Sequence, residues 1–339
     1  MKAAQRTLTG RTEAVIQVDS DVPLPGLAAN LPDEHVLVKV HFTALNPIDL
    51  KFPEHPVISK FLKTTIPCLD FAGTVASSSC SRFTTGDAIF GQTQPPNFGA
   101  CAEYVVVGAQ HCAKVPEGVE LQDAATIGIA GLMAFQSIVP YAKAKDRVFI
   151  NGGSGGVGTY GIQIARAIGC SVIVACSDAN AALCKRLGAE KVIDYRTQNV
   201  AEALEKSNEQ FDLIVDNVLS DLDIYWTCHK SLKPKGRYIT TAVRPEINFA
   251  WNALKVFLWP AILGGGQRQF GIAARKSNTS DYEQIAAWVQ DGTIDPIVER
   301  VYNLEDIAEA FERLRSGRTR GKLVVKISER PRALHRVEG

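Results

Sequence analysis

The sequence lacks the cysteine and histidine spacings that usually mark a metal site. Its eight cysteines include no C-x-x-C pair, and its six histidines include no H-x-x-x-H pair. The missing cysteine pairs remove the usual signature of a structural zinc site. We therefore expect no bound metal, and we interpret the scattered thiols as buried, reduced side chains of a cytoplasmic protein.

Long apolar runs and clusters of one charge are also missing. The N-terminal stretch has no continuous apolar segment of the kind that a secretory signal needs. The most apolar run, residues 256–266, is shorter than the ~20 residues that cross a bilayer. The net charge is only +1, and no run of Lys and Arg stands out. We expect neither a nucleic-acid partner nor an integral membrane segment.

What is present suits a folded chain of two domains. The sequence has 339 residues, of which 46% are hydrophobic, enough for a substantial core. Short runs rich in β-branched residues cover 35–45, 71–78 and 102–116, with Gly and Pro between them. This pattern is typical of strands joined by turns and predicts an antiparallel, barrel-like β domain.

The pattern changes near residue 121. A helical segment over 121–139 precedes apolar strands that alternate with helices. The expected strands are 147–150, 171–175, 191–194, 211–217 and 237–241, and the expected helices are 157–169, 179–188 and 199–207. Such alternation predicts an α/β fold with a doubly wound parallel sheet. Helices over 280–292 and 305–317 then lead to a strand over 321–327, which we expect to return to the first domain.

The strongest motif is the glycine loop within residues 149–165. Gly153, Gly155 and Gly158 fit G-x-G-x-x-G, with a strand before the loop and a helix after it. Gly153 is expected to make the tight turn, Gly155 to admit a pyrophosphate and Gly158 to let the helix pack on the strand. The helix N-terminus offers N–H groups to phosphates. We expect Ser154, Gly156 and Val157 of the same loop to bind the dinucleotide as well.

The end of the second strand bears on the choice between NAD and NADP. Asp178 stands where a mechanical count places the carboxylate that would bind the ribose 2′-hydroxyl of NAD. The strand tip itself is Cys176-Ser177, so we interpret Asp178 as the N-cap of the next helix. Ser177 does not repel a 2′-phosphate, and we expect NADPH, although no Arg or Lys adjoins Ser177 in the sequence.

These motifs together resemble the medium-chain dehydrogenase/reductase superfamily over roughly residues 10–328. The segments "NPIDLK", "PCLDFAGTV", "AATIGIAGLMAF", "NGGSGGVG", "LGAEKVIDY" and "GKLVV" are similar to its zinc-free quinone oxidoreductase group. That group includes chloroplast-envelope quinone oxidoreductase homologues and fungal trans-acting enoyl reductases. The resemblance implies a GroES-like β-barrel catalytic domain from 1–120 and 273–339, with a Rossmann NADPH-binding domain over 121–272 between them.

The resemblance also implies a metal-free site. Asn46 stands where zinc-dependent relatives have their first ligand, and 69–73 has neither His nor Glu at the second. Asn46, Asp49 and Lys51 are then expected to be catalytic, with Lys51 as a donor to the substrate oxygen or the nicotinamide ribose. The further residues that we expect to bind the cofactor are Asn180, Tyr195, Asn217, Phe270, Gly271 and Lys322.

The expected activity is NADPH-dependent, metal-independent hydride transfer to an activated double bond or quinone. An enolate spreads the developing charge, so a few donors suffice where an alcohol dehydrogenase needs a Lewis acid. The expected substrate is a small hydrophobic conjugated carbonyl compound, and the protein a monomer or homodimer. Two alternatives stay open: a trans-acting enoyl reductase of a polyketide pathway, with the apolar segment 247–266 lining its tunnel, and a non-catalytic NADPH-binding regulatory protein.

Overall fold

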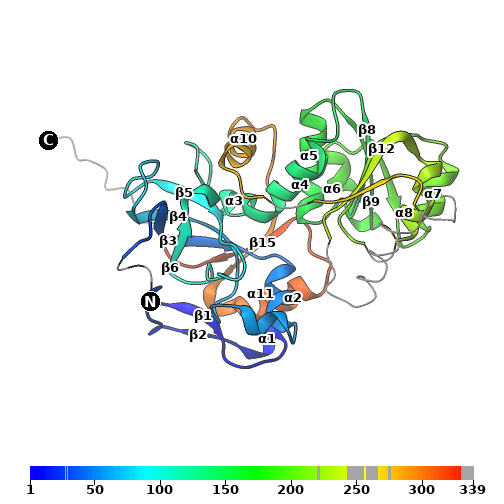
Figure 1. The fold of residues 1–339 in the computed structure, drawn as a ribbon. Helices are drawn as coiled ribbons and strands as arrows, with labels where there is room; N and C mark the ends of the chain where they lie inside the picture. The colour runs from blue at the N-terminus through cyan, green and yellow to red at the C-terminus, as the bar shows by residue number, and fades with distance from the viewer. Residues whose placement is uncertain are drawn as a thin grey trace.

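The computed structural model describes residues 1–26, 28, 30–219, 222–242, 256, 266–273 and 276–329. Two main sheets organise these residues, and Figure 1 shows the sheet around β3 on the left and the sheet around β8 on the right. The expected fold class is confirmed: a mostly antiparallel sheet accompanies a Rossmann-type parallel sheet.

The first sheet belongs to the GroES-like domain. Its strand order is β14-β15-β3-β4-β5-β7, and β6 also pairs with β3. The strands that the first half of the chain contributes are β3 (His35–Ala44), β4 (Asp70–Ser78), β5 (Ala88–Gln92), β6 (Tyr104–Gly108) and β7 (Cys112–Lys114). In β3, Val36, Val38 and Val40 are fully buried and alternate with partly exposed residues, as expected when one face covers a core.

The last part of the chain completes this sheet. The strands β14 (Val298–Asn303) and β15 (Lys322–Lys326) run parallel to each other, and β15 pairs antiparallel with β3. The helix α11 (Ile307–Arg315) connects them and contacts α1 (Thr12–Val15) and β2 (Ile16–Asp19). The strand β1 (Ala3–Arg6) pairs with β2, and the helix α2 (Ile48–Glu54) contacts α1. Both ends of the chain therefore build one domain (Figure 1).

The second sheet is parallel throughout, in the order β10-β9-β8-β11-β12-β13. Its strands are β8 (Arg147–Asn151), β9 (Ser171–Cys176), β10 (Lys191–Asp194), β11 (Phe211–Asp216), β12 (Leu232–Thr240) and β13 (Gln269–Ile272). The helices between them are α5 (Gly156–Ala167), α6 (Ala181–Arg186), α7 (Val200–Lys206) and α8 (Asp223–Thr227). Residues 172–176 are all buried, because helices cover both faces of the sheet.

Two expected elements are interrupted in the structure. The single helix expected over 121–139 is α3 (Leu121–Ala124), a π-turn (Ile127–Gly131) and α4 (Leu132–Ile138). The strand run expected over 102–116 breaks between β6 and β7 at a 3₁₀ turn, Ala109–His111. A π-turn often forms at functional sites, and this one leads to a buried carboxylate described below.

The remaining expectations fall partly beyond the described residues. The helix expected over 280–292 is α10 (Thr279–Gln290). The apolar segment 247–266 lies outside the described residues except for Val256, which is buried, and Gly266. Among the residues that the structure describes, no helix is both long and apolar enough to cross a membrane.

Candidate functional site

A cavity of about 710 Å³ lies where the two chain ends meet the Rossmann sheet. Its walls include the glycine loop, the ends of β8, β9 and β11, and the segments 45–47 and 317–323. The strand order reverses between β8 and β11, and dinucleotides bind at such a reversal, beyond the carboxyl ends of the strands. The chain therefore places the cavity where this fold binds a dinucleotide.

Most of the expected cofactor-binding residues line this cavity. They are Ser154, Gly155, Gly156, Val157, Gly158, Ser177, Asn180, Tyr195, Asn217 and Lys322, and Asn46 lines it too. Gly153, Phe270 and Gly271 are not among the lining residues. Phe270 instead stacks on Tyr238, with ring centroids 5.6 Å apart, in the packing around β12 and β13. The lining set also includes residues that the motifs did not predict.

Gly153 lies in the tight turn over 152–155, which the N–H of Gly155 closes by donating to the carbonyl oxygen of Gly152 at 3.3 Å. Gly152 begins this turn at φ 79°, a backbone conformation that favours glycine. Gly153 also packs closely on the sheet, because a Cβ on it would lie 2.7 Å from Val174 on β9. A Cβ on Gly158 would lie 2.1 Å from the carbonyl oxygen of Gly152, whereas one on Gly155 meets nothing nearer than 3.7 Å. At Gly155 the protein itself would therefore accept a Cβ at an ordinary van der Waals distance.

Three buried polar atoms in the cavity wall have no hydrogen-bond partner among the described residues. They are Asn180 Oδ1, Asn217 Nδ2 and Thr319 Oγ1. The other end of each amide is held: Asn180 Nδ2 donates to Ser154 Oγ at 3.0 Å, and Asn217 Oδ1 accepts from Thr241 Oγ1 at 2.7 Å. Buried polar atoms without partners cost free energy. An amide acceptor, an amide donor and a hydroxyl beside a glycine loop fit a dinucleotide.

Two arginines also line the cavity. Arg196 follows Tyr195 directly after β10, and Arg318 comes from the loop before β15. Interpreting Asp178 as an N-cap was wrong, because Ser177 is the N-cap residue and Asp178 begins the 3₁₀ turn. Asp178 does not line the cavity. The local sequence around Ser177 held no cation, whereas the folded chain places Arg196 and Arg318 in the wall of the same cavity.

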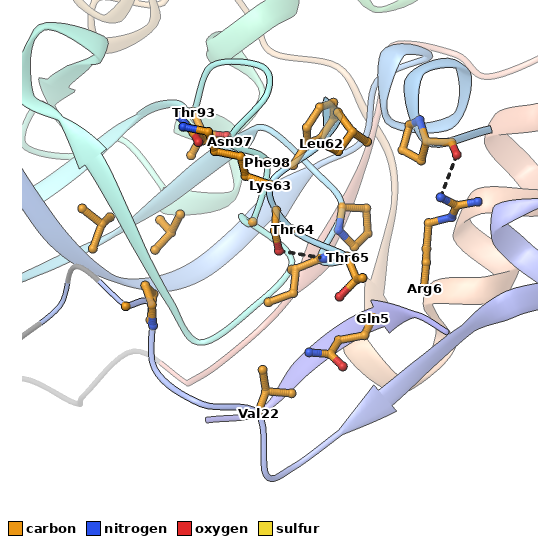
Figure 2. Close-up of a pocket in the computed structure, with 18 of the residues that line it drawn as sticks. Gln5, Arg6, Val22, Leu62, Lys63, Thr64, Thr65, Thr93, Asn97 and Phe98 are labelled. Atoms are coloured by element: carbon orange, nitrogen blue, oxygen red, sulfur yellow. Dashed lines mark hydrogen bonds between the residues drawn. The ribbon is translucent and has the colours of Figure 1, made fainter. Parts of the chain in front are cut away.

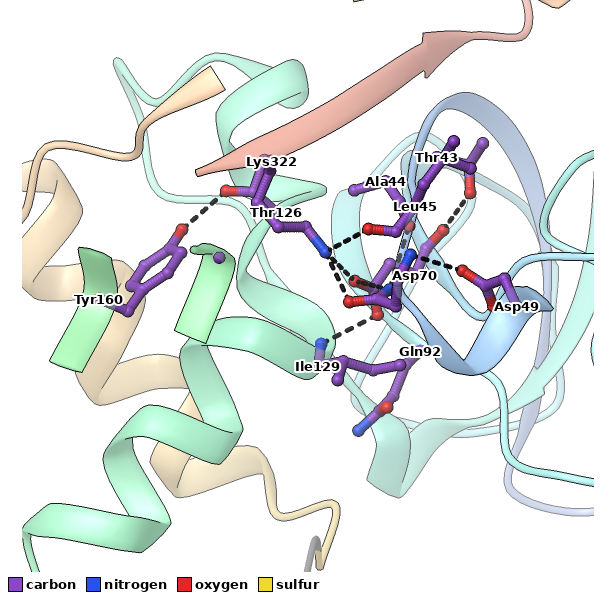
Figure 3. A network of polar contacts seen from close by, with 12 residues as sticks. Thr43, Ala44, Leu45, Asp49, Asp70, Gln92, Thr126, Ile129, Tyr160 and Lys322 are labelled. Atoms are coloured by element: carbon purple, nitrogen blue, oxygen red, sulfur yellow. Dashed lines mark hydrogen bonds and ion pairs between the residues drawn. The ribbon is translucent and has the colours of Figure 1, made fainter. Parts of the chain in front are cut away.

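Asn46 and Asp49 of the segment "NPIDLK" belong to a closed network of hydrogen bonds (Figure 3). The buried Lys322 Nζ donates to Asn46 Oδ1 at 2.6 Å and to the carbonyl oxygen of Leu45 at 2.9 Å, and lies 3.4 Å from Asp70 Oδ2. Asn46 Nδ2 donates to Asp70 Oδ2 at 2.8 Å and to the carbonyl oxygen of Ala44 at 3.2 Å. Lys322 is 3% exposed and Asp70 is fully buried, so the pair lies in a region of low dielectric.

The other two residues of the expected catalytic trio lie away from the cavity. Asp49 is fully buried, and its Oδ2 accepts the backbone N–H of Asn46 at 2.7 Å, so it orients the backbone at Asn46. Lys51 is an exposed residue of α2, and neither residue is among those that line the cavity. The structure therefore brings Asn46 together with Lys322 and Asp70, and a catalytic role of Lys51 stays a prediction.

Asp70 also ties the network to the π-turn. Its Oδ1 accepts the backbone N–H of Ile129 at 2.9 Å, and a Cβ on Gly128 would lie 2.4 Å from the same oxygen (Figure 3). Close by in the same figure, Tyr160 and Thr126 share a 2.7 Å hydrogen bond, and burial raises the pKa of Tyr160. Sequence reasoning missed Asp70, and its only signal was a lone acid at the start of an apolar strand.

A second, larger hollow of about 1160 Å³ lies on the GroES-like domain (Figure 2). It shares no lining residue with the first cavity, and it contains no part of the glycine loop. Among the described residues, Lys60, Lys63 and Arg6 line it and no Asp or Glu does, and Arg6 donates to the carbonyl oxygen of Pro53 at 2.8 Å. Its size alone does not make it the cofactor site, because the phosphate-binding loop is elsewhere.

No group of three or more His, Cys, Asp or Glu in the described part of the chain could hold a metal ion. At the position expected to correspond to the first zinc ligand of zinc-dependent relatives, this chain has Asn46, whose amide already binds Lys322 and Asp70. The absence of metal stays a prediction for the whole chain.

Comparisons with known proteins identify the family. Residues 32–117 match the alcohol dehydrogenase GroES-like domain model, and 187–325 match the zinc-binding dehydrogenase model. The chain is 39% identical to a trans-enoyl reductase, pgmF, of Aspergillus terreus, across 94% of this chain and 93% of that protein. It is 28% identical to a chloroplastic quinone-oxidoreductase homolog of Spinacia oleracea, across 94% and 95% of the two chains. A solved quinone oxidoreductase from Coxiella burnetii superposes with a TM-score of 0.83 at 28% identity, covering 97% and 99%. The chain therefore belongs to the medium-chain dehydrogenase/reductase superfamily and has the fold of its quinone oxidoreductase-like members.

Proposed function

We propose that the protein is an NADPH-dependent reductase of activated carbon–carbon double bonds or quinones, and that enoyl thioesters are its preferred class. The observation that carries the proposal is the fixed ammonium of Lys322 beside the glycine loop. A Cβ on Gly156 would lie 2.9 Å from Lys322 Cδ, so this lysine packs directly on the loop that would bind the pyrophosphate. The 39% identity to a trans-enoyl reductase supports the choice of substrate class.

The chain's own residues supply charge and position, while bound NADPH would supply the hydride. Lys322, held by Asn46 and Asp70, places a positive charge at the cavity wall without any reorganisation during the reaction. Such a charge favours an acceptor that becomes an enolate. Because the cavity wall also contains Ala130 and Leu45, part of the site is apolar and helps to exclude water.

The arginines and hydroxyl groups in the cavity wall support NADPH over NADH. Arg196 and Arg318 can form charge-assisted hydrogen bonds with a 2′-phosphate, and Ser177 and Tyr195 add hydroxyl groups. Tyr195 is 54% exposed, so its hydroxyl group can reach a ligand at the mouth of the cavity. Among the described residues, Asp223 is the carboxylate that lines the cavity, and Asp178, which follows Ser177 in the chain, does not line it.

The test is a panel of steady-state assays on purified protein. NADPH consumption is followed with an enoyl thioester, an enone, a quinone and a simple ketone, and every assay is repeated with NADH. We expect turnover of the conjugated acceptors with NADPH, little turnover with NADH and none with the ketone. The proposal is wrong if no conjugated acceptor is reduced, or if the ketone is reduced as fast.

The closed network favours one further candidate function. Both N–H groups of the Asn46 amide and the three donors of Lys322 already have partners within the protein. A protein that binds NADPH without catalysis needs no free donor in its site. Tight NADPH binding with no turnover of any acceptor would identify this second function.

A further inference from the structure

Two buried thiols meet at the edge of the dinucleotide cavity. Cys176 is the last residue of β9, and Cys184 lies in α6, which packs on the same sheet. The Cys184 thiol donates to Cys176 Sγ across 3.6 Å. Cys176 also lines the cavity, whereas Cys184 does not. The cavity wall therefore contains one sulfur atom with a second directly behind it.

We propose that Cys176 and Cys184 form a peroxide-driven modification site that closes to a disulfide and weakens NADPH binding. The Cys176 thiolate attacks one oxygen of hydrogen peroxide, giving a sulfenic acid and, after protonation of the leaving hydroxide, water. Cys184 then attacks the sulfenic sulfur atom, which forms the S–S bond and releases a second water. Two thiols are oxidised and one peroxide is reduced to two waters, so the step needs no other reagent.

The surroundings favour Cys176 as the attacking sulfur. The hydrogen bond from Cys184 lowers the pKa of Cys176, against the opposing effects of burial and of the carboxylates of Asp194 and Asp178. The pKa of Cys184 is raised, first because its proton is held in that hydrogen bond and then because of burial. A small neutral oxidant that enters the cavity meets Cys176, and the resolving thiol is already in contact.

A second pair of thiols in the same chain serves as an internal control. Cys68 and Cys101 also share a side-chain hydrogen bond, and both are fully buried. Neither lines the dinucleotide cavity or the larger hollow on the GroES-like domain. In both pairs the two thiols are hydrogen-bonded, but only the Cys176–Cys184 pair has a sulfur atom that a molecule in the dinucleotide cavity can reach.

Closing the disulfide changes the chain segment that binds the ribose end. An S–S bond is about 2.05 Å long, so the two sulfur atoms must approach each other by well over an ångström. Ser177 and Asn180 lie between the two cysteines in the sequence and line the cavity, and Asn180 is bonded to Ser154 of the glycine loop. Oxidation therefore displaces groups that we expect to bind NADPH. By linkage, bound NADPH must disfavour the disulfide at equilibrium by the same factor.

The first experiment maps disulfides in the full-length protein. Reduced protein is treated with hydrogen peroxide, with and without saturating NADP⁺, and is then alkylated, digested without reductant and analysed by mass spectrometry. We expect a linked Cys176–Cys184 peptide, slower linkage with NADP⁺ and no linked Cys68–Cys101 peptide. The partly exposed Cys80 reports that peroxide was active. Oxidised Cys80 without the Cys176–Cys184 link would overturn the proposal.

The second experiment measures NADPH affinity by fluorescence titration before and after peroxide. We expect affinity to fall about tenfold, within the usual range of coupling between sites, and to recover with dithiothreitol. Cys184→Ser should bind NADPH normally when reduced and should show neither the link nor the reversible loss of affinity. A Cys184→Ser protein that loses affinity as fully as the wild type would contradict the coupling. If that variant does not fold, Cys184→Ala takes its place.

The two readouts separate this inference from the proposed function. The affinity experiment rests on the proposed NADPH site, whereas peptide mapping detects the disulfide whatever the cavity binds. A disulfide without any change in NADPH affinity would refute the coupling, and the reductase assays would still stand.

Discussion

At the scale of single residues, the site depends on one buried pair of opposite charges. Lys322 could be selected from the motif "GKLVV" by resemblance, and Asn46 from "NPIDLK". Asp70, which completes the pair, could not, because a single acid in an apolar run gives no spacing to recognise. Its partners come from β15, the turn before α2 and the π-turn, and only the fold brings these together.

Replacing Lys322 with methionine should destabilise the protein and abolish reduction of enoyl thioesters. The change leaves the carboxylate of Asp70 buried without its cation, which costs about 3–5 kcal/mol in comparable pairs. Urea denaturation measures this loss. The double variant Lys322→Met, Asp70→Asn should recover most of the stability but not the activity.

Lys326→Met is the matched control for that change. Lys326 lies on the same strand, and its partner Glu329 has a side chain that is 84% exposed. Surface ion pairs contribute about 0–1 kcal/mol, so this variant should keep both stability and activity. A Lys322→Met protein as stable as Lys326→Met would show that the buried pair contributes nothing.

Alanine variants of two loop glycines should affect the stability of the protein and its NADPH affinity differently. Gly158→Ala places a Cβ 2.1 Å from a backbone oxygen, so we expect a loss of about 1–3 kcal/mol from overpacking, together with weak NADPH binding. The new Cβ of Gly155→Ala would lie 3.7 Å from the carbonyl oxygen of Gly152, an ordinary contact, so this variant should fold normally, yet its methyl group takes room from the pyrophosphate. Thermal denaturation and NADPH titration distinguish them. Equal stability of both variants would contradict the packing role of Gly158.

At the scale of elements, period and composition located most strands and helices of the Rossmann domain to within a few residues. The strand expected over 191–194 coincides with β10, and the helix expected over 199–207 contains α7. The segment 121–139 failed as a single helix because its small apolar residues fit either turn geometry. In the π-turn, the backbone N–H of Ile129 donates to Asp70, and Gly128 packs against the same carboxylate. A contact between residues so far apart in the chain produces no periodic pattern in the sequence.

The helix α11 should contribute stability that disappears in acid. Arg315 Nε and Nη2 each donate to Glu13 at 2.6 Å, and Arg315 also pairs with Glu54, so α11 is tied to α1 and α2. Burial raises the pKa of both glutamates, but hydrogen bonds from Arg315 and the backbone outweigh it, and each pKa lies below its ordinary 4.5. Depressed carboxylate pKa values stabilise the folded state above the ordinary pKa, and this stabilisation is lost as the pH falls below it.

Arg315→Met should therefore cost about 2 kcal/mol at pH 7, the scale of hydrogen bonds to charged groups. The difference from wild type should shrink steadily as the pH falls below about 4.5, the ordinary pKa of these carboxylates. Urea denaturation across this pH range measures it. Arg300→Met, whose pair with Glu309 is 4.0 Å long and exposed, is the control and should differ little from wild type at any pH. A pH-independent Arg315→Met penalty would point to packing alone.

At the scale of the whole molecule, the cavity forms because two segments that are far apart in the sequence, 45–47 and 317–323, both reach the glycine loop. Gly155 forms a parallel bridge with Gly321, and the N–H of Gly321 donates to Ser154 at 2.9 Å. This contact brings Lys322, Thr319 and Arg318 to the glycine loop. The sequence alone predicted the two domains and the returning strand, but not that its preceding loop would supply cations. That placement depends on the register of β15 against β3, which local patterns do not encode.

Because both domains line the cavity, cofactor binding should stabilise the molecule as a unit. A ligand present at 100 times its Kd adds about 2.7 kcal/mol to the folded state, so NADPH should raise the Tm at a concentration where NADH does little. Arg196→Ala combined with Arg318→Ala removes two cations that line the cavity together with Ser177 and Tyr195. Each charge-assisted hydrogen bond contributes about 1.5–3 kcal/mol, so the concentration of NADPH that gives a fixed rise in Tm should increase by at least about tenfold. The NADH response should stay unchanged, because NADH has no 2′-phosphate for these arginines to bind. If the double variant lost its responses to NADPH and NADH equally, the arginines would act on the shape of the cavity and not on the 2′-phosphate.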